Sequence, residues 1–228
     1  YDVGWTLQPI EVRDRYSRWT NSLFNLRIAY KTTIADNHNV SAMVGTEQQR
    51  SNYSYAMAYR KNFVSSAIPQ IDVGSTSPND AETGGSASES AYNNFFGRLN
   101  YDFNSKYLLE FVFRYDGSQI FPEGKRYGFF PAISAGWRLS EENFIRNNLP
   151  FVNELKLRAS YGELGNDRVP AYQYLQAFQF GNNYVFGGAD SPGIYSSRMP
   201  NPDITWEVSK KLDLGLEASL WNLSLIHI

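Results

Sequence analysis

Hydrophobic and polar residues alternate with a period of two along much of this chain. The stretch KYLLEFVFRYDGSQIF, residues 106–121, begins with Tyr, Leu, Phe, Phe and Tyr at its odd positions, and with Lys, Leu, Glu, Val, Arg and Asp at its even ones. Alternation of this kind predicts β-strands with one apolar and one polar face. Segments that show it are residues 19–32, 38–59, 92–103, 106–117, 127–139, 152–163 and 204–221.

Charged residues follow this alternation closely. Sixteen of them share the polar row of their own strand, whereas Lys210 falls on an apolar row near a strand end, where its long stem can reach a polar boundary. The sixteen are Arg27, Lys31, Arg98, Asp102, Lys106, Glu110, Arg114, Asp116, Arg138, Glu154, Lys156, Arg158, Glu207, Lys211, Asp213 and Glu217. Each predicted strand therefore has an apolar face and a wet face.

The connections between the segments predict an up-and-down meander. Those at one rim run for about 5, 2 and 12 residues and those at the other for about 32, 9 and 40, so one rim carries most of the loop sequence. Asn104 and Ser105 are predicted to form a two-residue hairpin turn. Residues 72–90 contain no aromatic residue and many Gly, Ser and Pro, and we expect them to form a mobile loop.

One short helical turn is predicted at SEENFIRNN, residues 140–148. Ser140 is the expected cap, and Glu141 and Glu142 would lie at the positive end of the helix dipole. No acid–base role is needed to explain this carboxylate pair.

Alternation also occurs in soluble β-sandwiches, whose apolar faces pack against a second sheet. Three further features favour a transmembrane barrel: strands of ten or more residues, aromatic residues near both ends of several apolar rows, and the uneven loops. The bilayer core holds no water, so backbone groups must pair within a closed sheet, and a Lys or Arg that faces lipid at mid-depth costs about 2–4 kcal/mol. We predict an all-β, antiparallel up-and-down barrel of which this chain supplies about seven strands.

Composition excludes several function classes. The chain has 228 residues, a formal net charge of −2 and 16% aromatic residues, and the absence of a basic excess argues against nucleic-acid binding. Without cysteine it has no disulfide, thiolate metal site or thiol nucleophile. No apolar run approaches the roughly 18 residues of a membrane-spanning helix. Because the chain starts at Tyr1 with neither Met nor signal peptide, we expect a fragment of a longer protein.

Catalytic, metal and cofactor sites are not predicted. The two histidines, His38 and His227, lie far apart in sequence, and His38 is expected to be a hydrogen-bonding turn residue. No nucleophile, base and orienting group converge, so the chain is not expected to be an enzyme.

Several blocks carry a resemblance to a known family. NNFFGRLNYDFNSKYLLEFVFRYDGSQIF, RYGFFPAISAGWRLSEENFI, LKLRASYGELGND and NPDITWEVSKKLDLGLEASLWN, in this order, resemble the C-terminal barrel portion of SusC/RagA-type TonB-linked outer-membrane proteins of Bacteroidetes. The resemblance implies a 22-stranded barrel in a Gram-negative outer membrane. It also implies an N-terminal plug, import of oligosaccharides or peptides driven through TonB, and a SusD-type surface lipoprotein as lid. Residues 1–222 would be a partial barrel domain in contact with outer-membrane lipid and 223–228 a doubtful truncated tail, with the plug and the TonB-contacting segment missing from this chain.

Two sets of residues are candidates for function. Seven charged residues of the polar row would face the lumen and contact the plug or line a hydrated path: Arg98, Glu110, Arg114, Arg138, Glu154, Lys156 and Arg158. Six aromatic residues of 164–203 would contact substrate or a partner lipoprotein, because sugar faces stack on aromatic rings: Tyr172, Tyr174, Phe178, Tyr184, Phe186 and Tyr195.

Two alternatives stay open at this point. A secreted soluble β-sandwich that binds carbohydrate would sequester its apolar rows between two sheets, and a passive porin or adhesin barrel would need no plug. The sequence does not distinguish glycan from peptide as cargo.

Overall fold

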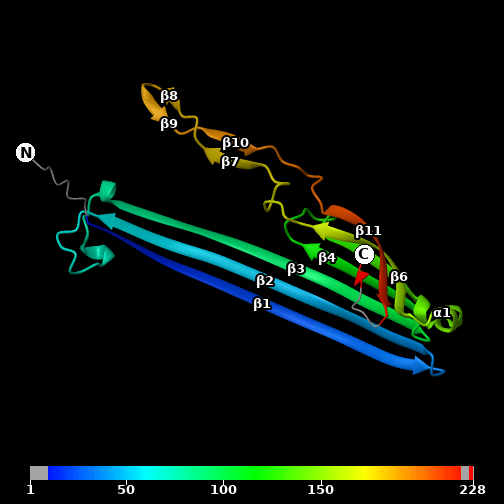
Figure 1. Cartoon of the computed structure of the whole chain (residues 1–228). Helices are drawn as coiled ribbons and strands as arrows, with labels where there is room; N and C mark the ends of the chain where they lie inside the picture. The colour runs from blue at the N-terminus through cyan, green and yellow to red at the C-terminus, as the bar shows by residue number, and fades with distance from the viewer. Residues whose placement is uncertain (1–9, 222–225, 228) are drawn as a thin grey trace, which may run out of the picture. The chain divides into compact units, whose positions relative to one another are not determined.

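The computed structural model describes residues 10–221 and 226–227, and it confirms an all-β chain (Figure 1). The strands are β1 (Glu11–Ile34), β2 (His38–Lys61), β3 (Ala81–Phe103), β4 (Tyr107–Ser118), β5 (Tyr127–Arg138), β6 (Val152–Asn166), β7 (Ala177–Phe180), β8 (Tyr184–Phe186), β9 (Ala189–Ser191), β10 (Ile194–Arg198), β11 (Glu207–Leu220) and β12 (Ile226–His227). The helices are short: η1 (Ile71–Val73), η2 (Pro78–Asp80), η3 (Leu139–Glu141) and α1 (Asn143–Asn148). No helix among these residues is long and apolar enough to cross a membrane.

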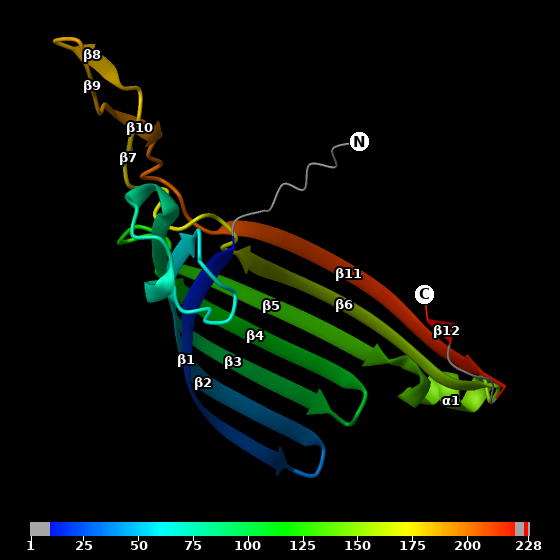
Figure 2. The ribbon, with the colours of Figure 1, turned by 90° about the vertical axis from the view of Figure 1, so that its left-hand side faces the viewer.

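The main sheet runs in sequence order, β1-β2-β3-β4-β5-β6-β11-β12, as a meander should. Two small hairpins, β7 with β10 and β8 with β9, are inserted between β6 and β11. The chain divides into two compact units, a smaller one of residues 1–22 with 49–90 and a larger one of residues 23–48 with 91–228. Figure 2 shows β3, β4, β5, β6 and β11 side by side in the larger unit.

Tight turns connect the strands at one rim of the larger unit. The β3–β4 turn has positive φ at Asn104 and Ser105, 52° and 56°, and the amide of Lys106 donates to the carbonyl of Phe103 at 2.9 Å. Both central residues of a type I′ hairpin turn adopt this left-handed conformation. The reversal at Asn104 and Ser105 is as predicted, but the loop is one residue longer than expected, because Phe103 pairs with Tyr107 and residues 104–106 all lie between the strands.

Aromatic belts lie at both ends of the apolar rows. At the end with the tight turns, Tyr107 stacks between Phe103 and Trp137, with ring centroids 6.2 Å away on each side. At the other end, Tyr115 and Tyr127 stack at 4.9 Å. The eight residue steps from Tyr107 to Tyr115 extend about 26 Å along the strand, or roughly 20 Å of depth at a 40° tilt, which places the rings near the edges of an apolar band about 25 Å tall.

The apolar rows between these belts are open to the surroundings rather than packed. Leu109, Ile133 and Leu214 keep 45%, 48% and 76% of their surface exposed. Among the described residues, the buried large hydrophobic side chains are Phe63, Phe121 and Phe130. A β-sandwich would bury Leu109 and its neighbours under a second layer, so the structure contradicts that alternative.

Glycines on the apolar row are covered by rings from the adjacent strand. A Cβ placed on Gly97 would lie 2.4 Å from the Phe113 ring across the β3–β4 ladder, and one on Gly117 would lie 2.5 Å from the Tyr127 ring. Each ring therefore occupies the space that a side chain at the glycine would need.

Two sequence predictions were wrong at the end of the sheet away from the tight turns. The expected mobile loop is strand from Ala81 onward, because β3 includes residues 81–90. β1 begins at Glu11 rather than at 19 and ends two residues later than expected. These outer segments are polar or lack strict alternation, so the period-two pattern does not reveal them.

The helix cap was also predicted wrongly. Ser140 is buried within η3, and Glu142 occupies the N-cap position of α1 without a side-chain capping bond. Its carboxylate instead accepts hydrogen bonds from the Tyr107 hydroxyl at 2.7 Å and the Trp137 indole at 3.2 Å, and Lys106 lies 3.4 Å away. These contacts, the Tyr107 hydrogen bond foremost, lower the pKa of Glu142 below its ordinary 4.5. We call Glu142 and these three partners the Glu142 clasp; it joins the β5–β6 connection to the aromatic belt.

Candidate functional site: the polar face and the long-loop segment

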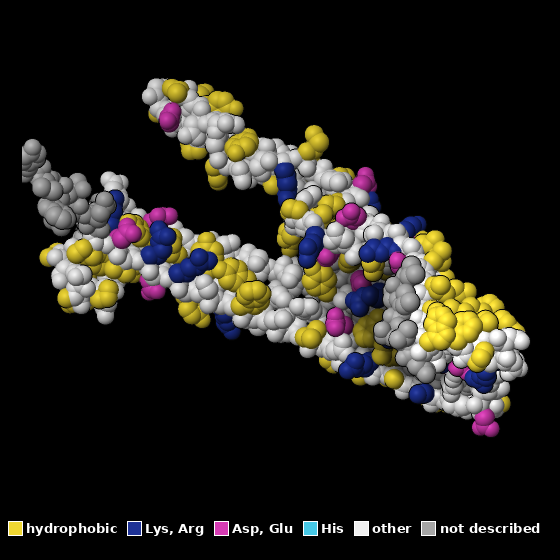
Figure 3. Space-filling model, in the orientation of Figure 1, with side chains coloured by type: hydrophobic (Ala, Val, Ile, Leu, Met, Phe, Trp, Pro, Cys, Tyr) yellow, Lys and Arg dark blue, Asp and Glu magenta, His cyan; other side chains and the backbone are white. Residues whose placement is uncertain are grey.

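The polar rows of the larger unit enclose a groove of about 680 Å³. Its polar lining comes from five neighbouring strands and continues onto β1 and β2. One row can be followed in register across β3, β4, β5, β6 and β11: Asn100, Glu110, Ser134, Ser160 and Asp213. Figure 3 shows basic and acidic side chains interspersed around β4 and β6, while hydrophobic side chains gather at the end that carries α1.

Six of the seven predicted lumen residues take part in cross-strand ion pairs: four form two separate pairs, and two share one carboxylate. Arg98 lies 3.5 Å from Glu110, and Arg138 lies 3.9 Å from Glu154. Lys156 and Arg158 both contact Glu217, at 3.5 and 3.2 Å. Exposed ion pairs of this kind each contribute about 0–1 kcal/mol, so the alternating charges define a hydrated surface more than they stabilise the sheet.

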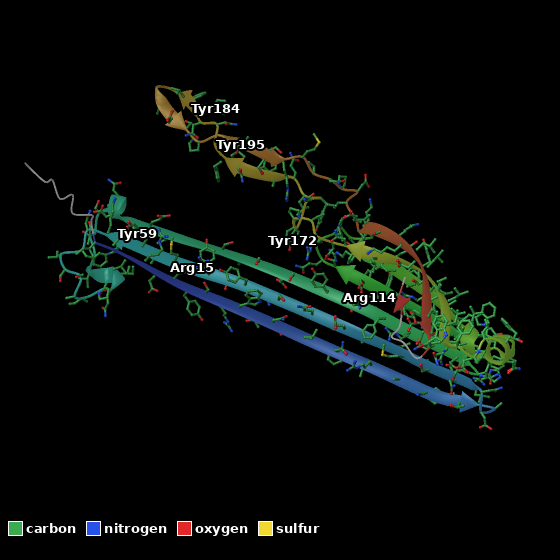
Figure 4. The ribbon with its side chains drawn as sticks, viewed as in Figure 1. Arg15, Tyr59, Arg114, Tyr172, Tyr184 and Tyr195 are labelled. Carbon is green, nitrogen blue, oxygen red and sulfur yellow. The ribbon has the colours of Figure 1, made fainter. Side chains whose placement is uncertain are left out.

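Arg114, the seventh, forms a bidentate pair within its own strand. Its Nε and Nη2 donate to the two carboxylate oxygens of Asp116, both at 2.8 Å. The guanidinium carbon also lies 6.0 Å from the centroid of the Phe96 ring on β3. Figure 4 shows Arg114 near the end of β4. The two parallel hydrogen bonds fix the orientation of the guanidinium relative to Asp116.

A glycine makes room for Arg158. In the register of the sheet it lies between Gly136 on β5 and Gly215 on β11. A Cβ on Gly215 would lie 2.4 Å from the Arg158 Nε. The missing side chain at Gly215 leaves the space that Arg158 occupies as it reaches Glu217, whereas Gly136 lies against Leu108 and Lys156.

The charge on the apolar row has a partner that the sequence analysis overlooked. Lys210 does not only extend toward a boundary: its Nζ lies 3.2 Å from Glu163, its direct cross-strand partner on β6. Glu163 also accepts a hydrogen bond from the Tyr161 hydroxyl at 3.0 Å. Glu163 has the parity of the apolar row of β6, a second exception that the sequence analysis did not count, and the two opposite charges pair at the strand end.

The six predicted aromatic binders are not brought into one cluster. Tyr172 and Tyr174 lie 6.3 Å apart, centroid to centroid, in the turn before β7. Phe178 and Tyr195 belong to the β7–β10 hairpin, and Tyr184 and Phe186 belong to β8. Figure 4 shows Tyr172, Tyr195 and Tyr184 at separate points along the segment. Phe186 is 83% exposed, so these rings present an extended apolar surface rather than a closed pocket.

A packed aromatic cluster at the loop end of the larger unit was missed by the sequence analysis. Phe121 is fully buried, and its ring lies 5.4 Å from that of Trp206; Phe130 contacts Trp206 at 5.2 Å. The Trp206 indole donates to the carbonyl of Arg126 at 3.0 Å. The NPDITW segment before β11 thus fixes the β4–β5 loop. The sequence signal that could have revealed this cluster is Phe130, an apolar residue on the otherwise polar row of β5.

Serine and carboxylate groups close the same region. The Ser118 hydroxyl, at the end of β4, donates to Asp167, the first residue after β6, at 2.9 Å.

His38 is the first residue of β2, and its Nδ1 lies at hydrogen-bond distance, 2.8 Å, from the Tyr101 hydroxyl.

Residues 2–227 match the family model described as TonB dependent receptor-like, beta-barrel. The chain belongs to the TonB-dependent receptor β-barrel family. It is 35% identical over 195 residues to TonB-dependent receptor P26 of Formosa agariphila, covering 86% of this chain and 20% of that protein. It is 28% identical over 237 residues to TonB-dependent receptor SusC of Bacteroides thetaiotaomicron, covering 95% of this chain and 22% of that protein.

A solved structure shares the fold. The RagAB peptide importer in its closed-closed state superposes with a TM-score of 0.80 at 27% identity, over 92% of this chain and 23% of that chain. The resemblance inferred from the sequence blocks is therefore confirmed, and this segment of a TonB-dependent receptor is part of an outer-membrane β-barrel. It spans about a fifth of the length of the curated relatives it matches. The family consists of receptors rather than enzymes.

Proposed function

We propose that the full-length TonB-dependent receptor containing this chain imports oligomeric nutrients, glycans or peptides, across the outer membrane. The observation that carries the proposal is the pair of opposite faces in one sheet: an exposed apolar band between two aromatic belts, and a charged, grooved face behind it. Similarity to SusC and to the RagAB peptide importer supports it. In this proposal the present chain supplies barrel wall and extracellular loops.

The polar face would bind a plug domain supplied by another part of the receptor. Its ion pairs are exposed and mutually balanced, so they can exchange partners with polar groups of a plug at little cost in free energy. The residues assigned to this contact are Arg98, Glu110, Arg114, Arg138, Glu154, Lys156 and Arg158.

Six aromatic residues of 164–203, five of them exposed and Tyr174 half-buried, would contact a SusD-like surface lipoprotein or the oligomeric cargo. Exposed aromatic side chains spread along an extracellular segment offer several points of contact to a partner. The residues assigned here are Tyr172, Tyr174, Phe178, Tyr184, Phe186 and Tyr195.

Uptake in living cells tests the proposal. A strain that depends on this receptor is supplied with labelled glycan and peptide oligomers, and uptake is compared with and without a functional TonB. We expect uptake to be lost when TonB is removed while the receptor remains in the membrane. Uptake that is unchanged without TonB would instead support the passive-porin alternative, and absence of uptake in either strain would point to an adhesin.

A further inference from the structure

The smaller unit carries an arginine–tyrosine face that the polar groove does not explain. On β1 the same-parity residues include Arg13, Arg15 and Trp19, and on β2 they include Tyr53, Tyr55 and Tyr59. Residues of one parity lie on one face of a strand. We call these six residues the arginine–tyrosine face. Figure 4 shows Arg15 and Tyr59 on the adjoining parts of β1 and β2 that lie away from the tight turns.

Aromatic rings, rather than carboxylates, hold the two guanidinium groups. The Arg15 Cζ lies 4.1 Å from the centroid of the Tyr55 ring, and its Nη2 donates to the Tyr53 hydroxyl at 2.8 Å. The Arg13 Cζ lies 5.4 Å from the centroid of the Tyr59 ring. Stacking on rings orients a guanidinium while leaving most of its N–H donors unused.

The two guanidinium groups on this face are therefore oriented by tyrosine side chains. Within residues 10–221, neither Arg13 nor Arg15 forms an ion pair, whereas Arg50, of opposite parity on β2, pairs with Glu89. The nearby Glu11 carboxylate accepts a hydrogen bond from the Tyr59 hydroxyl at 2.7 Å. The lumen arginines of the larger unit, in contrast, each contact a carboxylate.

A groove of about 510 Å³ on the same unit is lined in part by Tyr53, whose hydroxyl accepts the hydrogen bond from Arg15. Trp19 and Tyr53 form one side with their rings edge to face at 6.3 Å, and Trp19 is 77% exposed. Ser51, Ser88 and Ser90 lie along the rest of it, together with Asn52 and Glu89. The groove thus combines an open aromatic platform with hydroxyl groups, which suits a sugar ring that has an apolar face and a polar edge.

We infer that this face binds an acidic oligosaccharide, with Trp19 and Tyr53 stacking on a sugar ring and Arg13 and Arg15 binding its carboxylate or sulfate groups. The inference rests on the proposed import function and names a substrate class for it. A neutral glycan would leave both guanidinium groups without an anion, and a peptide would make little use of the serine hydroxyls beside an aromatic platform.

Binding by the purified full-length receptor in detergent tests the inference. Calorimetric titrations use an oligogalacturonate, a maltooligosaccharide of equal length as neutral probe, and a polyglutamate peptide as acidic non-sugar probe. We expect the oligogalacturonate to bind most tightly and its affinity to fall as NaCl is raised from about 0.05 to 0.5 M, because salt screens exposed charges. The Arg13→Gln/Arg15→Gln variant should lose about tenfold or more in affinity, since each charged hydrogen bond lost costs roughly that factor.

Matched variants separate local charge from general damage. Arg18→Gln removes a charge from the opposite face of the same strand and should bind like the wild type. Arg15→Lys keeps the charge without the planar fork and should recover part of the loss, while Trp19→Ala should weaken the oligogalacturonate without changing salt dependence. Heat-modifiable migration on gels confirms that each variant is a folded barrel.

Three outcomes would overturn the inference: equal affinity for the neutral probe, tighter binding of polyglutamate, or an Arg13→Gln/Arg15→Gln variant that binds like the wild type. These results are distinguishable from failure of the import proposal. If TonB-dependent uptake persists unchanged in the double variant, only the acidic-glycan assignment is overturned. If uptake is the same with and without TonB, the import function is overturned, whatever the binding data show.

Discussion

Replacing Ile133 with Arg should destabilise the barrel through its contact with lipid. Ile133 lies midway between Phe129 and Trp137, about 13 Å along the strand from each, and its side chain is 48% exposed on the apolar face. A lipid-facing Arg at this depth costs about 2–4 kcal/mol, whereas the same change near an interface costs about 0–1 kcal/mol. We therefore expect Ile133→Arg to cost roughly 3 kcal/mol and Phe129→Arg clearly less.

The adjacent residue on the same strand supplies the control. Ser134 has the same depth but faces Glu110 and Ser160 across the ladder, on the polar groove. Ser134→Arg should stay within about 0.5 kcal/mol of the wild type, because the new charge meets water and a carboxylate. Stability is measured by guanidinium unfolding of the full-length receptor in phospholipid vesicles, followed by tryptophan fluorescence. Equal costs for Ile133→Arg and Ser134→Arg would refute the assignment of the two faces.

Further predictions concern the Glu142 clasp and the loop end. Because the pKa of Glu142 is lowered in the folded state, its carboxylate stabilises the clasp at pH values above the ordinary carboxyl pKa, and this effect is lost as the pH falls through the folded-state pKa. Acidification should therefore change the fluorescence of Trp137 in the wild type. A Glu142→Gln variant should show no such transition. Gly97→Ala should cost about 1–3 kcal/mol by overpacking against Phe113, measured by the unfolding midpoint, and adding Phe113→Leu should restore part of it. Trp206→Phe should cost about 1 kcal/mol by leaving a carbonyl unpaired, and faster proteolysis of residues 119–126 would report the loosened loop, whereas an unchanged cleavage rate would contradict that role.

Strands and their two faces could be predicted from the sequence because lipid and water impose opposite chemistry on alternate residues. The place of the β3–β4 hairpin was predictable, but its register was not: the loop has three residues rather than two, which sets the apolar rows side by side and leaves Arg98 diagonal to Glu110. Outer parts of β1 and β3 were not, because a strand with water on both sides needs no alternation. For this reason Arg13 and Arg15 were left out of the predicted strand that contains Trp19.

Contacts across long connections could not be predicted either. The pairing of Lys156 and Arg158 with Glu217 depends on the register of β11 against β6, which no tight turn sets. Likewise, Ser140 has the right chemistry for a helix cap, yet Glu142 occupies the N-cap position of α1, where its carboxylate bonds to aromatic side chains of β4 and β5. Local preference gives way where distant segments supply a better set of partners.

The rings that lie over glycines link residue choice between neighbouring strands. In two cross-strand pairs, Gly97 with Phe113 and Gly117 with Tyr127, the ring fills the space beside the glycine. Neither residue of a pair can therefore change in size by itself without leaving a gap or causing a clash. Divergence of this barrel wall should therefore proceed by paired exchange. Among distant relatives, a bulkier residue at position 97 or 117 should be found together with a smaller one at its partner position.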